Sequence, residues 1–449
     1  MEKNLTSGSV FRNIMLFSLP YLLSYFLQTL YGMADLFIIG QFEGVAGTTA
    51  VSIGSQVMHV LTVVLVGLAM GSTVSVGQSV GAGDKRQSSL NIGNTVTLFM
   101  SLSLVLTAVL LLLVRQIISV MSTPPEAVAG TADYLTICFI GIPFVTAYNI
   151  ISSIFRGLGD SKSPMYFIAV ACAANIVLDY LFIGALKMGP SGAALGTTLS
   201  QAISVAVALA VIRRHGKNGV SLRRSDMRPQ KAVMGQLLKI GVPVALQDGI
   251  IQVSFIVITI IANRRGLTDA AAVGIVEKII SFLFLVPSSM LSTVSALGAQ
   301  NIGAGKPGRA VLTLRYAIFI ASGFGLIISI LIQFVSEPVV GLFTDDLAVM
   351  VSGGKYLRGY IWDSLFAGVQ FCFSGYFCAC GRSGLSFMHN FLSTVFVRIP
   401  GAYMTSMLFP HTLFPMGLAS SAGSLVSVII CVIAFSVLTH RDRALLQGG

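Results

Sequence analysis

Long apolar runs recur along almost the whole chain and exclude a water-soluble fold. Each run holds about 20 apolar residues, enough for one helix to cross a hydrocarbon layer about 30 Å thick. The composition agrees, since 55% of the 449 residues are hydrophobic and only 10% are charged. The runs are too long for barrel strands, and an open sheet edge cannot face lipid, so we expect an all-α membrane protein.

The pattern predicts twelve transmembrane helices. Glycine- and proline-rich joints separate them, such as Gly-Ala-Gly-Asp at 81–84 and Gly-Lys-Pro-Gly at 305–308. The first run is too long for the apolar part of a signal peptide. The expected spans are 14–40, 48–76, 91–114, 131–155, 164–186, 191–212, 239–262, 271–299, 311–335, 355–377, 385–409 and 414–438.

The basic residues predict how the chain is oriented. With the N-terminus inside, about 20 of the 28 Lys and Arg fall in cytoplasmic loops, which is where such residues concentrate. We therefore expect a multi-pass protein of the inner (plasma) membrane with both termini in the cytoplasm. These loops account for the formal charge of +11, so no nucleic-acid partner is expected. The basic linker at 213–238 is instead expected to rest on anionic membrane lipid.

Three motifs occur twice in the chain, at an offset of about 222 residues. The matching pairs are 18–20 with 241–243, 77–85 with 299–306, and 155–161 with 377–383. Such repetition predicts an internal duplication, an N-lobe of residues 1–212 and a C-lobe of residues 239–449. Each lobe would hold six spans, an even number, so a pseudo-two-fold axis along the membrane normal should relate them.

Two carboxylates lie inside predicted spans, Asp35 in the first and Asp179 in the fifth. A charged side chain in lipid costs several kcal/mol, so intramembrane acids usually face a protein interior or a wet cavity and often belong to ion pathways. The alternative is a packing hydrogen bond made by a protonated Asp. Both interpretations remain open for either residue alone.

Spacing places other polar groups beside these acids. Tyr31 precedes Asp35 by four residues and Asn175 precedes Asp179 by four, so each pair shares one helix face. The run directions of the spans put both acids and Thr197 in the outer half of the bilayer. Carboxylates, an amide and a hydroxyl at one depth suit a hard monovalent cation or a shared proton. Tyr31 and Thr197 could equally be packing residues.

These motifs resemble those of the multidrug and toxic compound extrusion (MATE) family. The resemblance rests on Gly-Gln-x-x-Gly-Ala-Gly at 77–83, Ala-Gln-Asn-Ile-Gly-Ala-Gly at 299–305 and Phe-Arg-Gly-Leu-Gly-Asp-Ser at 155–161, and it covers essentially the whole chain. It implies two six-helix lobes around a central cavity. It also implies secondary active export of amphipathic organic cations, by alternating access, in exchange for H⁺ or Na⁺.

The resemblance also implies an ion site in the N-lobe. Its expected members are Asp35, Asn175 and Asp179, with Tyr31 and Thr197 at matching positions. Na⁺ at the first three residues is the one metal expected, and no cofactor is expected besides the coupling ion. Pro20 corresponds to the proline that is thought to bend the first span.

The C-lobe departs from the family pattern. Some members carry a Glu in span seven and an Asp in span ten, where this chain has Gln252 and Ala367, so a second ion site of that kind is not expected. A candidate polar site remains there, formed by Asp248, Gln252, Asp363 and Arg398. It could be an internal ion pair of Arg398 with an Asp, or a surface that faces substrate.

Other classes of protein fit less well. A lipid-linked oligosaccharide flippase of the same broader superfamily shares the two-lobe design, but flippases tend to line the cleft with several Arg, and this chain has one deep Arg, Arg398. We do not expect an enzyme, because no His-Glu-x-x-His motif and no His pair at ligand spacing occurs in any span. The expected oligomeric state is a monomer.

Overall fold

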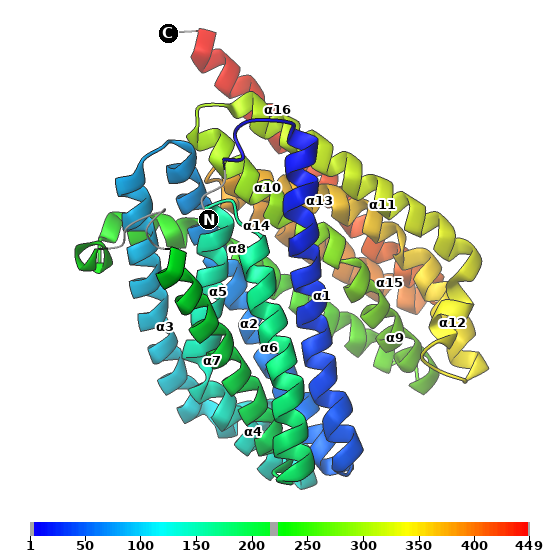
Figure 1. The fold of residues 1–449 in the computed structure, drawn as a ribbon. Helices are drawn as coiled ribbons and strands as arrows, with labels where there is room; N and C mark the ends of the chain where they lie inside the picture. The colour runs from blue at the N-terminus through cyan, green and yellow to red at the C-terminus, as the bar shows by residue number, and fades with distance from the viewer. Residues whose placement is uncertain (1–3, 216–222, 448–449) are drawn as a thin grey trace. The chain divides into compact units, whose positions relative to one another are not determined.

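A computed structural model describes residues 4–215 and 223–447, and every regular element in them is a helix (Figure 1). All twelve predicted spans correspond to helical segments. In chain order these are α1 (Val10–Phe42), α2 (Val45–Gly81), α3 (Lys85–Val120), α4 (Val128–Ile140) with α5 (Ile142–Gly157), α6 (Lys162–Asp179) with the π-helix η2 (Tyr180–Ala185), α7 (Gly189–His215), α8 (Lys231–Asn263), α9 (Leu267–Leu283) with α10 (Leu285–Gly303), α11 (Pro307–Gly341), α12 (Leu347–Tyr360) with α13 (Trp362–Ala379), α14 (Ser383–Ser393) with the π-helix η4 (Thr394–Arg398) and α15 (Ile399–Leu408), and α16 (Phe414–Gln447). Two short 3₁₀ helices, η1 (Pro125–Ala127) and η3 (Arg224–Met227), lie in connections.

Most of these segments can cross a membrane by length and composition. In the described part of the chain, nine helical segments are long and apolar enough, and a tenth is added if α4 and α5, bent by 48°, form one span. The tenth and eleventh predicted spans are interrupted, by Ile361 between α12 and α13 and by η4 between α14 and α15. Several elements extend beyond the predicted spans, because hydropathy detects only the apolar part of a helix.

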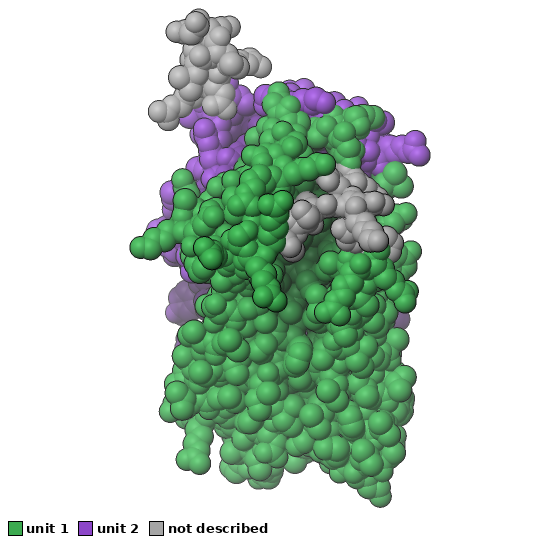
Figure 2. Space-filling view, turned by 60° about the vertical axis from the view of Figure 1, so that its left-hand side comes forward, with its two compact units in different colours: residues 1–8, 15–245, 299–305 green, residues 9–14, 246–298, 306–449 purple. Residues whose placement is uncertain are grey.

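The chain packs into two compact units, coloured separately in Figure 2. Unit 1 comprises Met1–Gly8, Met15–Ala245 and Ala299–Gly305, and unit 2 comprises Ser9–Ile14, Leu246–Gly298 and Lys306–Gly449. Three helices pass from one unit to the other: α1 after Ile14, α8 after Ala245 and α10 after Gly298. These changeovers lie inside helices, whereas the sequence pattern suggested a division at the linker.

Each unit has its own apolar core. In unit 1 it includes Ile39, Val51 and Leu135, which are completely buried. In unit 2 it includes Ile258 and Val276, also completely buried. Close packing of such side chains fixes the neighbouring helices against one another within each unit.

The end of α2 and the last turn of α10 cross backbone to backbone inside unit 1. A Cβ atom on Gly81 would lie 1.9 Å from the carbonyl oxygen of Gln300, and one on Gly303 would lie 2.0 Å from that of Gln78. These four residues are repeat partners in the motifs 77–85 and 299–306, so the contact is reciprocal. Only glycine allows so close an approach, which explains the glycines of the repeated motif.

The linker is shorter than the range 213–238 suggested. The helix α7 continues to His215 and α8 begins at Lys231, while residues 216–222 lie outside the described residues. The described end packs on α3, where Asn94 Nδ2 donates to the carbonyl of Asp226 at 3.2 Å and Asn94 Oδ1 accepts from the N–H of Gln230 at 2.8 Å. This part of the linker is therefore held by protein contacts.

Asp226 is the charged centre of that contact. Its side chain accepts from the backbone N–H of Arg223 at 2.9 Å and pairs with the Arg86 guanidinium at 2.5 Å. The N–H of Arg223, and then Arg86, lower the pKa of Asp226 below its ordinary value, against the opposing effect of burial. A lowered pKa means that the ionised form stabilises the fold above the ordinary pKa, and that this stabilisation disappears as pH falls through the folded value.

The first prediction concerns the backbone crossing. Gly303→Ala should destabilise the protein by about 1–3 kcal/mol, because its methyl group would overlap the carbonyl of Gln78 and force the two helices apart. The thermal unfolding midpoint of the purified protein measures the change. Gly308→Ala is the matched control, since nothing lies within 4 Å of its Cβ position. Equal midpoints for the two variants would contradict the contact.

The second prediction concerns Asp226. The Asp226→Asn variant should unfold at a lower temperature than the native protein at pH 7. This difference in unfolding temperature should shrink as the pH falls below about 4, because protonation then removes the charge of Asp226, as the substitution does in the variant. Unfolding midpoints of both proteins across this pH range provide the measurement. A difference that persists unchanged at pH 3 would exclude the charge as its cause.

Candidate functional site

The two intramembrane acids of the N-terminal half meet inside unit 1. Asp35 in α1 is 2% exposed, and Asp179, the last residue of α6, is completely buried. The Asp35 and Asp179 carboxylates lie close enough to interact electrostatically. The Thr197 hydroxyl of α7 donates to Asp35 Oδ2 at 2.9 Å, and Asn175 Nδ2 donates to Asp179 Oδ1 at 3.3 Å. Three helices thus each supply at least one polar side chain to one site.

Tyr31 borders this site and contacts α7. Its hydroxyl donates to the carbonyl of Thr197 at 3.1 Å and lies 3.2 Å from Ser200 Oγ. The Ser200 hydroxyl in turn donates to the same carbonyl at 2.8 Å. Tyr31 therefore fixes α1 against α7 one turn away from Asp35, and it positions the threonine that binds the carboxylate.

Gly196 sets how closely α7 approaches the acids. A Cβ atom at this position would lie 2.0 Å from Asp179 Oδ1, so any other residue would displace the carboxylate. Sequence reasoning did not select Gly196, although its position next to Thr197 was the available signal. The π-helix η2 begins directly after Asp179, and short π-helical segments are frequent at functional sites.

Three buried oxygen atoms at this site have no hydrogen-bond partner in the described part of the chain: Asp35 Oδ1, Asn175 Oδ1 and Asp179 Oδ2. A buried acceptor left unsatisfied costs about 1–3 kcal/mol, so each such atom in a native fold calls for an explanation. Oxygen atoms from two carboxylates and one amide suit a monovalent hard cation, and the two carboxylates alone can share a proton.

The polar residues of unit 2 form a different cluster. Arg398, at the end of η4, is buried, donates to the hydroxyl of Tyr360, and lies 5.2 Å from the ring centre of Phe255 and 5.5 Å from that of Tyr360. Asp363 and Glu277 interact with it electrostatically. Neither carboxylate oxygen of Asp363 has a hydrogen-bond partner among the described residues, so the structure shows no direct ion pair with Arg398.

The structure does not bring all four predicted residues of this lobe together. Asp248 and Gln252 lie on α8 and are partly exposed, and the described residues include no interaction of either with Arg398. Glu277 joins the cluster instead, with one oxygen accepting from Thr259 Oγ1 at 3.1 Å and the other without a partner. Glu277 could have been selected from the sequence because it is an acid inside the predicted span 271–299. No sequence pattern pairs it with Arg398.

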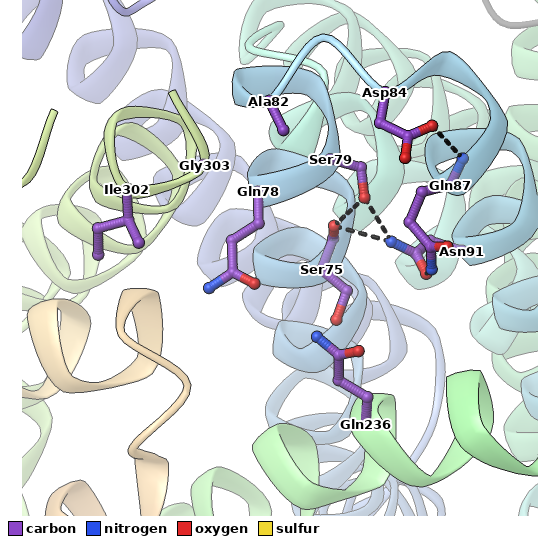
Figure 3. Close-up of a pocket in the computed structure, with 10 residues that line it drawn as sticks. All are labelled: Ser75, Gln78, Ser79, Ala82, Asp84, Gln87, Asn91, Gln236, Ile302 and Gly303. Atoms are coloured by element: carbon purple, nitrogen blue, oxygen red, sulfur yellow. Dashed lines mark hydrogen bonds between the residues drawn. The ribbon is translucent and has the colours of Figure 1, made fainter. Parts of the chain in front are cut away.

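A pocket of about 370 Å³ opens elsewhere in unit 1, between α2, α3, α8 and α10 (Figure 3). Its lining residues are Ser75, Gln78, Ser79, Ala82, Asp84, Gln87, Asn91, Gln236, Ile302 and Gly303. The segment 77–81 has the Gly-x-Ser-x-Gly spacing of a hydrolase nucleophile, but it lies on a helix, and Ser79 Oγ donates to the carbonyl of Ser75 at 2.8 Å. The spacing therefore does not mark a catalytic serine.

Proteins from two bacteria are similar in sequence to most of this chain. The MatE family model matches residues 20–181 and again residues 243–404. The probable multidrug resistance protein YpnP of Bacillus subtilis (strain 168) is 29% identical over 395 residues, which are 88% of each chain. The multidrug export protein MepA of Staphylococcus aureus (strain MRSA252) is 27% identical over 445 residues, covering 98% of this chain and 97% of that protein.

Solved structures share the fold. A crystal structure of MATE in the bent conformation superimposes with a TM-score of 0.89 at 21% identity, covering 99% of this chain and 98% of that chain. The family model matches once in each half of the sequence, which agrees with the internal duplication that the repeated motifs predicted. The chain therefore belongs to the MatE family, the multidrug and toxic compound extrusion transporters that its motifs resembled.

Proposed function

We propose that this protein exports amphipathic organic cations across the cell membrane in exchange for H⁺ or Na⁺ by alternating access, and that the coupling ion binds between Asp35, Asn175 and Asp179. The names of the relatives, a multidrug resistance protein and a multidrug export protein, support the substrate class. The observation that carries the ion site is the group of three buried oxygen atoms without partners.

A bound cation or proton would satisfy this group. Two buried carboxylates without compensation repel one another, and each ionised group loses its hydration in the protein interior. One positive charge between them offsets both effects. Asp35 is also bonded to Thr197, so occupancy of the site links α1, α6 and α7. An ion can shift the transporter only if it binds one arrangement of these helices more tightly than the other.

Pro20 supplies a place where α1 can bend. The helix is continuous from Val10 to Phe42, and Pro20 lies inside it, about four turns before Asp35. A proline removes one backbone hydrogen bond and is a common point of helix bending. We propose that ion occupancy at Asp35 biases α1 between a straight and a bent form. The matching Pro243 in α8 has no acid at the place equivalent to Asp35.

The same proposal includes the setting of the protein. The basic loops support a place in the inner (plasma) membrane with both termini in the cytoplasm, in contact with anionic lipid. The proposed oligomeric state is a monomer. Organic cations would then enter from the cytoplasm and leave on the outer side. The coupling ion serves as the only cofactor of this cycle.

The third prediction tests the ion site. Asp35→Asn should abolish gradient-driven export of a fluorescent organic cation from proteoliposomes, because an amide cannot exchange a proton or balance the charge of a bound Na⁺. Imposed pH and Na⁺ gradients, applied separately, identify the coupling ion. Asp179→Asn should act through the same site, so the double variant should be no worse than the worse single one.

A neighbouring threonine in α7 provides a control for this experiment. Thr198→Val changes the residue next to Thr197 without removing a bond to Asp35, and it should transport nearly normally, whereas Thr197→Val should be impaired. An Asp35→Asn protein that exports at the native rate against a gradient would overturn the proposed function. Losses that add in the logarithm of the rate would assign Asp35 and Asp179 to separate roles.

The fourth prediction tests the bending of α1. Pro20→Ala should impair ion-driven export more than binding of the organic cation, because the change affects the response of the helix and leaves the ion ligands in place. Pro243→Ala, the repeat-matched control, should have a smaller effect. Transport rates in proteoliposomes and dye affinity in detergent provide the two readouts. Equal defects in both variants, or normal transport by Pro20→Ala, would exclude the mechanism.

A further inference from the structure

Gln300 ties three distant segments of unit 1 together. It is completely buried in the last turn of α10. Its side-chain Oε1 accepts from the backbone N–H of Leu5 at 3.1 Å, and its Nε2 donates to the carbonyl of Gly157, at the end of α5, at 2.9 Å. The oxygen and the nitrogen of this side-chain amide therefore each bond to a backbone group, and these partners lie 295 and 143 residues away in the chain.

The N-terminal segment 4–8 is shaped for this contact. Leu5 is only 8% exposed. The Asn4 side chain accepts from the N–H of Thr6 at 2.8 Å and from its hydroxyl at 2.7 Å, which makes a local turn. Gly8 has a φ of +71°, a conformation that favours glycine, and the chain then enters α1 at Val10. The turn and the glycine thus position the N–H of Leu5 for its hydrogen bond to Gln300.

Gln300 also lies at a changeover between the two units. Ala299–Gly305 belongs to unit 1, whereas the preceding residues 246–298 belong to unit 2. Within unit 1 this short stretch is held by the backbone crossing of Gly303 with Gln78 and by the amide of Gln300. A displacement of residues 299–305 from α2 and α5, within unit 1, has to break or strain these contacts.

The repeat partner of Gln300 has a different environment. Gln78 occupies the same place in its motif, but it is partly exposed and lines the pocket of Figure 3. The glutamine of the duplicated motif is therefore completely buried and bonded to the N-terminal segment in one copy, and it lines a pocket in the other. This difference supplies a matched control, since the two glutamines share their sequence context.

We propose that Gln300 and residues 4–8 form a latch that holds the last turn of α10 in unit 1, and that the latch has to open during the transport cycle. The opening of the latch rests on the proposed function, whereas its holding of α10 does not. Two hydrogen bonds of this kind shift a two-state equilibrium by about ten-fold in total, which is enough to favour one state and small enough to open thermally.

Hydrogen exchange of the purified full-length protein tests the latch without any transport assay. In Gln300→Leu, which keeps the size but removes both bonds, the amide of Leu5 should exchange about ten-fold faster than in the native protein. In Gln78→Leu the rate should not change. Equal Leu5 exchange in the native protein and Gln300→Leu, or equal acceleration by both variants, would overturn the proposal.

Transport kinetics test whether opening matters. Gln300→Leu should raise the turnover of cation export several-fold with an unchanged KM, because the latched state is left more easily, and Gln78→Leu should not. Leu5→Pro removes the backbone donor and should reproduce the increase, which keeps the test available if Gln300→Leu does not fold. Unchanged or lower turnover in folded variants would overturn the role in the cycle. A native protein that exports no cation would instead refute the proposed function.

Discussion

The constraint on which this structure depends is that the hydrocarbon layer offers no hydrogen bonds. Every backbone group inside it must be satisfied by the protein, which accounts for a chain whose described elements are all helical. Polar side chains in the interior come under the same constraint. Many are bonded to a carbonyl one turn away or to a neighbouring helix, and single unsatisfied hydroxyl groups occur among the described residues of both units. What distinguishes the site around Asp35 is that two carboxylates and an amide leave oxygen atoms unsatisfied together.

The two duplicated halves differ at these sites. The cluster of Asp35, Asn175 and Asp179 leaves three oxygen atoms without partners, and a mobile cation or a proton can satisfy them. The cluster of unit 2 contains Arg398, a cation that is covalently attached and stays charged at any working pH. Its guanidinium is held by the Tyr360 hydroxyl and by aromatic faces. Each cluster holds two carboxylates, Asp35 and Asp179 in unit 1 and Glu277 and Asp363 in unit 2, and the cluster of unit 2 adds the covalently attached cation of Arg398.

Glycine residues determine how closely several of these helices pack. Without a hydrophobic driving force between helices in lipid, close backbone approach is what joins them, and a side chain at the crossing would prevent it. Gly81 and Gly303 permit the reciprocal crossing of α2 with the last turn of α10, and Gly196 permits α7 to reach the Asp179 carboxylate. The glycines of the repeated motif thus have a packing reason that does not depend on any ligand.

The sequence by itself determined the helical class, the twelve segments and the internal duplication, because span length, hydropathy and motif spacing are local properties. It also selected the residues that meet around Asp35, since i,i+4 spacing and span direction fix face and depth. Only the tertiary structure decided that Gly196 leaves room for the Asp179 carboxylate, that Arg398 donates to the Tyr360 hydroxyl, and that Gln300 binds Leu5. These contacts join residues far apart in the chain, and which of them form depends on how the helices pack, which no local pattern records.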